Sequence, residues 1–253
     1  MDILFVVILG ALWGSFANVC IYRLPLNKNI VKGRSFCPNC NSKILWFDNI
    51  PIISFIFLKA KCRNCEFRIP FRYPVVELLN LFIFLLVYLL FGITLTTLLL
   101  WILFLSFIII FFIDIEHFII PNQITFPLMT IGFLKSFDPN LHFIFPNYIN
   151  SLIGGIFGYL IIFSIIYFYK NLRKKEGMGL GDAKLFAVIG FWFGWISIPF
   201  VIFLSSFIAL ISITPSLLKK TKGMSSEIPF GPYIILATLV FLAFKENLIK
   251  IIL

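Results

Sequence analysis

The chain has 253 residues, of which 60% are hydrophobic and only 13% are charged, and this composition excludes an ordinary soluble domain. The net charge of +10 comes from basic residues that stand beside apolar stretches. There each can gain about 1 kcal/mol from anionic headgroups, so membrane lipids account for the excess charge and a nucleic-acid partner is not indicated.

Apolar segments long enough to cross a bilayer occur along the whole chain. Residues 1–22 are expected to be a retained first span, because no basic region and no small-residue cleavage site mark a signal peptide. The uncharged runs 78–113 and 185–218 are each too long for one span, and turn-forming residues near their middles predict two helical hairpins. These turn formers are Gly92 in the first run and Gly194, Ser197 and Pro199 in the second.

Three further spans are predicted at residues 124–134, 152–169 and 233–244. The predicted fold is therefore an all-α polytopic membrane protein with about eight transmembrane helices. The four segments that connect these spans on one face carry 18 of the 21 Lys and Arg residues. By the positive-inside rule this face is cytoplasmic, and both termini lie outside.

The first connecting segment, residues 23–77, contains four of the five cysteines. They form two Cys-x-x-Cys units, a pattern typical of a structural zinc site that would supply folding energy to a small loop. A pair of disulfides is the alternative, but a cytoplasmic loop is in a reducing compartment. The predicted ligands are Cys37, Cys40, Cys62 and Cys65, whereas Cys20 is expected to be a packing residue.

Two aspartates stand at predicted membrane boundaries on the cytoplasmic face. Asp114 ends the first long uncharged run, and Asp182 follows Gly177, Gly179 and Gly181 and precedes the second. Ionisable groups at such depth are candidates for function. If the two carboxylates meet, they can share one proton and divide acid and base roles in peptide hydrolysis.

Each aspartate also has a simpler interpretation. Asp182 could be an ordinary helix N-cap, and Asp114 could mark the point where a helix leaves the lipid. Glu116 is expected to be a solvated boundary residue. With only two histidines and no His-Glu-x-x-His stretch, the sequence does not indicate a zinc protease.

Ordered motifs through nearly the whole chain resemble the type IV prepilin peptidases, which are aspartyl proteases of the bacterial inner membrane. Besides the cysteine pairs and both aspartate motifs, the resemblance rests on Gly14-Ser-Phe-Ala-Asn18-Val-Cys-Ile-Tyr22-Arg-Leu-Pro25, Asp48-Asn-Ile-Pro51, Arg72-Tyr-Pro-Val-Val-Glu77 and Ile228-Pro-Phe-Gly-Pro232. The family often has Asp at the position of Asn122, which is a departure outside the catalytic positions.

This resemblance implies that Asp114 and Asp182 are the catalytic pair. It also implies that the enzyme cleaves the leader peptide of prepilin or pseudopilin precursors at the cytoplasmic face. Members with a cysteine-bearing first loop also methylate the new N-terminus with S-adenosylmethionine. The implied organisation is a first span (1–22), a zinc-binding methyltransferase loop (23–77) and a peptidase bundle (78–253).

Further site residues are expected beside these groups. Gly179, Gly181 and Lys184 are candidates for substrate binding next to Asp182, and the bare backbone of the glycine run would accept an extended peptide. Glu77 and Asn18 are candidates for holding the substrate amine or the methyl donor, although both could be packing groups. Two other functions stay open at this point: a transporter whose boundary carboxylates relay protons or cations, and a membrane scaffold with inert acids.

Overall fold

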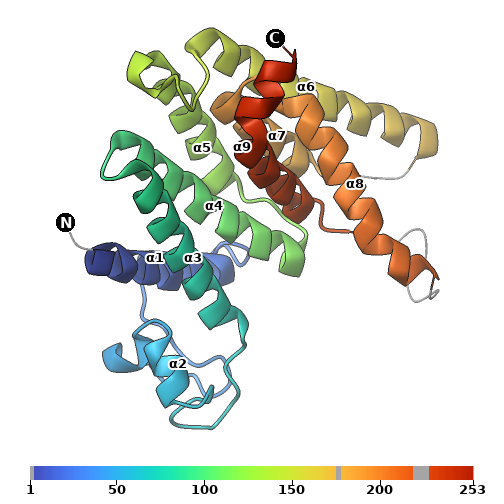
Figure 1. The fold of residues 1–253 in the computed structure, drawn as a ribbon. Coiled ribbons are helices and arrows are strands. Elements are labelled where there is room, and N and C mark those ends of the chain that lie inside the picture. Colours follow the sequence, from blue (N-terminus) through green and yellow to red (C-terminus); the bar gives the residue numbers. More distant parts are fainter. Residues whose placement is uncertain (1–2, 175–177, 219–227, 253) are drawn as a thin grey trace. The chain divides into compact units, whose positions relative to one another are not determined.

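The computed structural model describes residues 3–174, 178–218 and 228–252 (Figure 1), and within them it is helical without a single strand. It divides into two compact units, Met1–Phe112 and Ile113–Leu253, and each is considered by itself. The predicted all-α fold is confirmed.

In the first unit, helix α1 (Ile3–Arg23) packs along helix α3 (Arg72–Phe91). Small residues on α1 allow this close packing: a Cβ atom on Gly14 would lie only 2.7 Å from the Cα atom of Glu77. The buried Asn80 side chain donates a hydrogen bond of 2.7 Å to the Gly10 carbonyl oxygen. The loop that joins the two helices contains the 3-10 helix η1 (Trp46–Asn49) and the short helix α2 (Ile53–Phe57).

Each of the two uncharged runs forms two helices, with the turn at a predicted glycine. Helix α3 ends at Gly92, whose φ is +63°, before α4 (Leu95–His117) begins. Helix α7 (Leu180–Phe193) ends at Gly194, whose φ is +81°, before α8 (Ser197–Leu218) begins. Glycine adopts such positive φ angles without the steric cost of a Cβ atom.

The second unit also contains α5 (Asn122–Leu134), the 3-10 helices η2 (Lys135–Phe137) and η3 (Pro139–Leu141), α6 (Tyr148–Arg173) and α9 (Gly231–Ile252). Its tightest helix contact joins α6 to α7, where a Cβ atom on Gly190 would lie 2.0 Å from the Gly154 carbonyl oxygen. Only glycines allow two helix backbones to approach so closely.

Within the described residues, five helices are long and apolar enough to cross a membrane: α1, α3, α4, α6 and α8. Residues Gly231–Lys245 of α9 form a shorter apolar helix, while α5 and α7 have 13 and 14 residues. The chain is thus a multi-pass membrane protein. The number of eight spans and the division at residues 22 and 77 stay predictions.

Candidate functional site

Asp114 lies near the end of α4 and is buried, with only 4% of its surface exposed. Its Oδ2 atom accepts a hydrogen bond of 2.8 Å from the backbone N–H of Gly231, the first residue of α9. The first N–H groups of a helix have no partner within the helix and carry partial positive charge, so they attract a carboxylate. The start of α9 therefore holds Asp114 in place.

Asp182 is the third residue of α7 and is also buried, with 7% exposed. Its Oδ2 atom accepts a hydrogen bond of 3.2 Å from the N–H of Gly179. Gly179 is the N-cap of α7, so the alternative that Asp182 itself is the N-cap is wrong. The Asp182 carboxylate nevertheless stabilises the helix start through one of its two oxygens.

Ile120 connects the surroundings of the two aspartates. Its side chain would lie 3.0 Å from a Cβ atom on Gly181 and 3.4 Å from one on Gly231. The Asp114 and Asp182 carboxylates are close enough to interact electrostatically. The second unit therefore brings both predicted aspartates into one buried cluster.

The other residues predicted beside Asp182 have different surroundings. Gly179 is exposed and Gly181 is half-buried, while Gly177 lies outside the described residues. The Lys184 ammonium group donates a hydrogen bond of 2.7 Å to the Asn122 Oδ1 atom at the start of α5. An aspartate at position 122 would form an ion pair with this lysine.

Glu77 and Asn18 lie in a second polar cluster, between α3 and α1 in the first unit. The buried Glu77 carboxylate accepts hydrogen bonds from the Ile52 N–H, at 2.7 Å, and from the Ser15 side chain. The Asn18 amide donates to the Tyr73 carbonyl oxygen at 3.0 Å. In the part of the chain that the structure describes, the buried Asn18 Oδ1 atom accepts no hydrogen bond.

The four predicted cysteine ligands converge on one point of the first loop. Their sulfur atoms all lie within 4.8 Å of one another, and the Cys37–Cys65 and Cys40–Cys62 pairs are 3.7 and 4.0 Å apart. Four sulfurs bound tetrahedrally at zinc–sulfur distances of 2.3 Å lie about 3.8 Å apart. The cluster can therefore hold a metal ion. Cys20 is buried in α1.

The two Cys-x-x-Cys turns share one backbone geometry. The N–H of Cys37 donates to the Ser42 carbonyl oxygen, and that of Cys62 donates to the equivalent Phe67 carbonyl oxygen, at 3.0 and 2.9 Å. In both turns the residue after the second cysteine has a φ of +55°. Two independent turns of the same shape indicate that the metal-binding geometry is built into the backbone.

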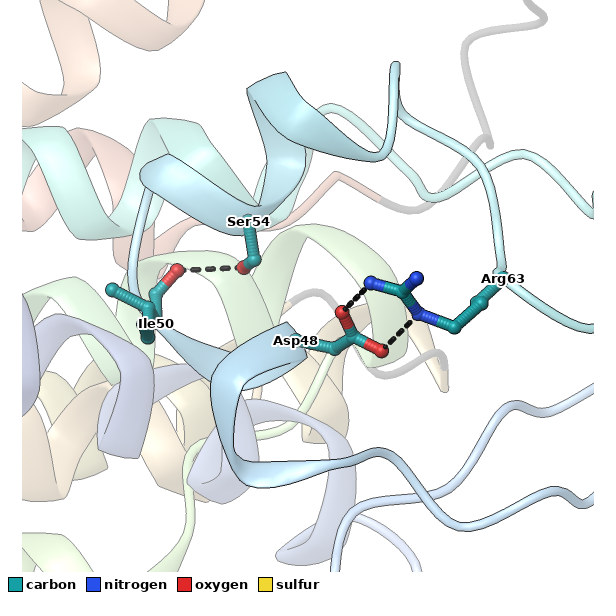
Figure 2. A network of polar contacts seen from close by, with 4 residues as sticks. All are labelled: Asp48, Ile50, Ser54 and Arg63. Carbon is teal, nitrogen blue, oxygen red and sulfur yellow. Dashed lines mark hydrogen bonds and ion pairs between the residues drawn. The ribbon is translucent and has the colours of Figure 1, made fainter.

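Local contacts favour the thiolate form of one ligand and attach the second turn to the rest of the loop. The Ser42 hydroxyl lies 3.0 Å from the Cys40 sulfur, and this hydrogen bond lowers the pKa of the thiol to about 6. Arg63, inside the second turn, donates two hydrogen bonds of 2.8 and 2.6 Å to Asp48 of η1 (Figure 2). This bidentate contact lowers the pKa of Asp48 below its usual range.

Ile120 and Gly231 are site residues that were not predicted. Gly231 was part of a motif that resembles the family, and a glycine between two prolines at a helix start was the available signal. Ile120 gave no signal, because an isoleucine at the end of an apolar run is typical of packing. Its contacts depend on the close approach of three segments that are far apart in the chain.

Comparisons with known proteins agree with this arrangement. Residues 8–91 match the family model described as "Bacterial Peptidase A24 N-terminal domain", and residues 101–214 match the model described as "Type IV leader peptidase family". No solved structure matches the chain.

Curated relatives match over nearly their full length. The chain is 33% identical to the prepilin leader peptidase/N-methyltransferase of Aeromonas salmonicida, an alignment that covers 94% of this chain and 89% of the relative. The proteins of the same name from Pseudomonas aeruginosa and Klebsiella pneumoniae are 32% and 37% identical, covering 98% and 80% of this chain and 92% and 90% of the relatives. The chain therefore belongs to the type IV leader peptidase family.

Proposed function

We propose that this chain is a prepilin peptidase in which Asp114 and Asp182 are the catalytic residues. The observation that carries this proposal is the pairing of two buried carboxylates from α4 and α7, each with one oxygen held by a glycine N–H. The substrates are prepilin or pseudopilin precursors, as the names of the curated relatives indicate. These comparisons do not favour a transporter.

Two carboxylates that share one proton can hydrolyse a peptide bond without a metal or a covalent intermediate. The ionised carboxylate takes a proton from water as the water oxygen bonds to the carbonyl carbon, and the protonated carboxyl group donates its proton to the carbonyl oxygen. The tetrahedral intermediate then breaks its C–N bond: the first carboxyl group gives its proton to the leaving nitrogen, and the second carboxylate takes a proton from a hydroxyl group of the intermediate. The products are a leader with a free carboxyl group and a mature chain with a new amino terminus.

The first test replaces each aspartate without changing its size. Asp114→Asn and Asp182→Asn should each reduce cleavage of a purified precursor by at least about 1,000-fold, because removing either group of such a pair prevents proton transfer. Glu116→Gln is a matched control, since Glu116 is exposed two residues after Asp114 on the same helix. Substantial cleavage by either aspartate variant, in protein that unfolds like the wild type, would exclude the assignment.

Gly179, Gly181 and Lys184 are proposed to contact the substrate beside Asp182. The exposure of Gly179 supports this proposal, because a residue without a side chain lets an extended peptide approach the backbone closely. The variant Gly181→Val tests it. If the glycine contacts the substrate, KM should rise while the unfolding temperature stays close to that of the wild type. A rise in KM that comes with a matching loss of stability would indicate a packing role only.

A second activity, methylation of the new amino terminus, is proposed for the first loop. When bound, S-adenosylmethionine supplies an activated methyl group. The sulfonium of this methyl donor and the ammonium of the substrate are both cations before transfer. The polar cluster between α1 and α3 offers oxygen atoms that attract a cation, in the Glu77 carboxylate and at the unsatisfied Asn18 Oδ1 atom. We propose that Glu77 and Asn18 hold one of these cations, while Glu77 also positions the loop through Ile52.

Zinc is the proposed metal of the cysteine cluster. Sulfur separations of 3.7 and 4.0 Å suit four-coordinate zinc, and a site with four thiolates is closed to substrate. The ion would therefore shape the loop rather than take part in catalysis. This role predicts that metal loss impairs methylation of a pre-cleaved substrate more than cleavage.

The proposed location is the bacterial inner membrane, with the aspartate pair at the cytoplasmic face. The charge asymmetry of the connecting segments supports this orientation. Accessibility of a cysteine introduced at Lys59 of the first loop to a membrane-impermeant thiol reagent tests it. Labelling in intact spheroplasts, before lysis, would contradict the cytoplasmic location.

A further inference from the structure

Helix α2 presents an unusual number of exposed apolar side chains for such a short element. We use the name α2 patch for Ile53, Ile56 and Phe57 together with Phe71, whose exposed fractions are 52%, 68%, 82% and 73%. Exposed large apolar side chains grouped on one short segment can mark an interaction site. None of the motifs assigned above uses these residues.

The start of α2 is fixed to the membrane span α3 by Glu77. This residue directly precedes the uncharged run that begins at residue 78 in the membrane span α3. Its carboxylate accepts the Ile52 N–H at 2.7 Å, so the backbone at the start of α2 lies at the same depth. Ile52 has a φ of +63°, a strained value for a β-branched residue, which persists only where surrounding contacts determine it.

The far part of α2 lies beside the first turn of α3. The rings of Phe55 and Phe71 meet edge to face with their centroids 5.5 Å apart. The six residues from Phe71 to Glu77 rise about 9 Å along a helix. The headgroup region on each side of a bilayer is about 5–8 Å thick. Helix α2, which runs from the level of Glu77 to that of Phe71, would therefore cross the headgroup layer and reach its outer edge.

The polar groups of this segment suit that layer. The Ser54 hydroxyl donates to the Ile50 carbonyl oxygen at 2.6 Å (Figure 2), so it needs no water partner. Residues 23–77 contain ten Lys and Arg but three acids, and two of these acids are paired within the loop, Asp48 with Arg63 and Glu66 with Lys61. The segment is thus apolar on one side and basic beside it, which matches an anionic membrane surface.

We propose that the α2 patch inserts into the headgroup layer of an anionic bilayer and anchors the first loop on the membrane surface. The hydrogen bonds that Arg63 donates to Asp48 then link the second cysteine turn to the anchored segment, so the metal-binding region is kept near the membrane surface without entering it. This placement is independent of which reaction the loop performs.

The test uses the full chain in nanodiscs made from phosphatidylethanolamine and phosphatidylglycerol. Phe57→Trp places a fluorophore in the patch, and Phe67→Trp is a matched control in the second cysteine turn, where Phe67 is 44% exposed. The signal of each added tryptophan is obtained by subtracting the spectrum of the wild type, which has five. Brominated acyl chains then quench only those fluorophores that contact lipid.

The proposal predicts blue-shifted emission for Phe57→Trp and quenching about twofold or more above that of Phe67→Trp, because interfacial tryptophans lie at the headgroup level. Replacing phosphatidylglycerol with a neutral lipid should weaken this difference. Equal quenching of the two variants, whether strong or weak, would overturn the assignment. So would a Phe57→Trp signal that responds only to added prepilin, since the patch would then be a protein-docking surface.

Discussion

Gly231→Ala tests whether the start of α9 positions the catalytic carboxylate. An added Cβ atom would lie 2.8 Å from the Asp114 Oδ2 atom and 3.2 Å from its Cγ atom, so the carboxylate must move away. That movement lengthens the 2.8 Å bond from the Gly231 N–H. A hydrogen bond to a charged group contributes about 1.5–3 kcal/mol, so kcat/KM for precursor cleavage should fall roughly 10- to 150-fold.

The assay is leader cleavage of a purified precursor at several substrate concentrations, together with the apparent unfolding temperature of each variant. Tyr233→Phe is the control two residues further along α9, since it removes only an exposed hydrogen bond of 2.9 Å from the tyrosine hydroxyl to Ser212. It should cleave like the wild type. If Gly231→Ala retains wild-type kcat/KM, or loses it only in proportion to unfolded protein, the role assigned to Gly231 is wrong.

Three other predictions follow from the same structure. Cys62→Ser should abolish stoichiometric zinc measured by mass spectrometry, whereas Cys20→Ala, outside the cluster, should retain it. Gly190→Ala should destabilise the protein by about 3 kcal/mol or more in denaturant titrations. The added Cβ atom would lie 2.0 Å from the Gly154 carbonyl oxygen and would force α6 away from α7. Unchanged stability would contradict the close packing of these two helices. Burial and a neighbouring lysine lower the pKa of Lys135 to about 6. In the unfolded chain a lysine has a pKa of about 10.4. Between these two pH values the unfolded chain therefore binds more protons than the folded one. The wild type should therefore gain stability relative to Lys135→Met from about pH 6 to about pH 9, and a pH-independent difference in unfolding temperature would refute this.

Several features of the fold could be predicted because they depend on local chemistry. Runs of uncharged residues longer than one span require a turn, and Gly92 and Gly194 were the residues able to adopt positive φ there. The cysteine cluster was likewise predictable, since a Cys-x-x-Cys turn places two thiolates side by side whatever surrounds it. The start of α7 was not, because this helix begins at Leu180, before the uncharged run, where the Asp182 carboxylate accepts the N–H of the N-cap Gly179.

The candidate active site was predicted only in part. Depth and composition identified Asp114 and Asp182, but not what holds them: the amide of Gly231 is 117 positions from Asp114 in the sequence. Glu77 was expected to bind a ligand, and the structure shows that its carboxylate also fixes the strained backbone of Ile52. Contacts of this kind depend on which helices meet, and residue patterns along one segment carry no information about that.

Residue types and their spacing were thus sufficient to predict a multi-pass helical membrane protein with a four-cysteine cluster and two candidate aspartates. These properties follow from residue type and spacing, because lipid requires long apolar helices and a metal requires paired thiolates. Only the tertiary structure decided that Asp114 and Asp182 share one buried cluster with Ile120 and Gly231. The reason is physical: burial and helix-end hydrogen bonds arise between segments, and they exist only once those segments have packed.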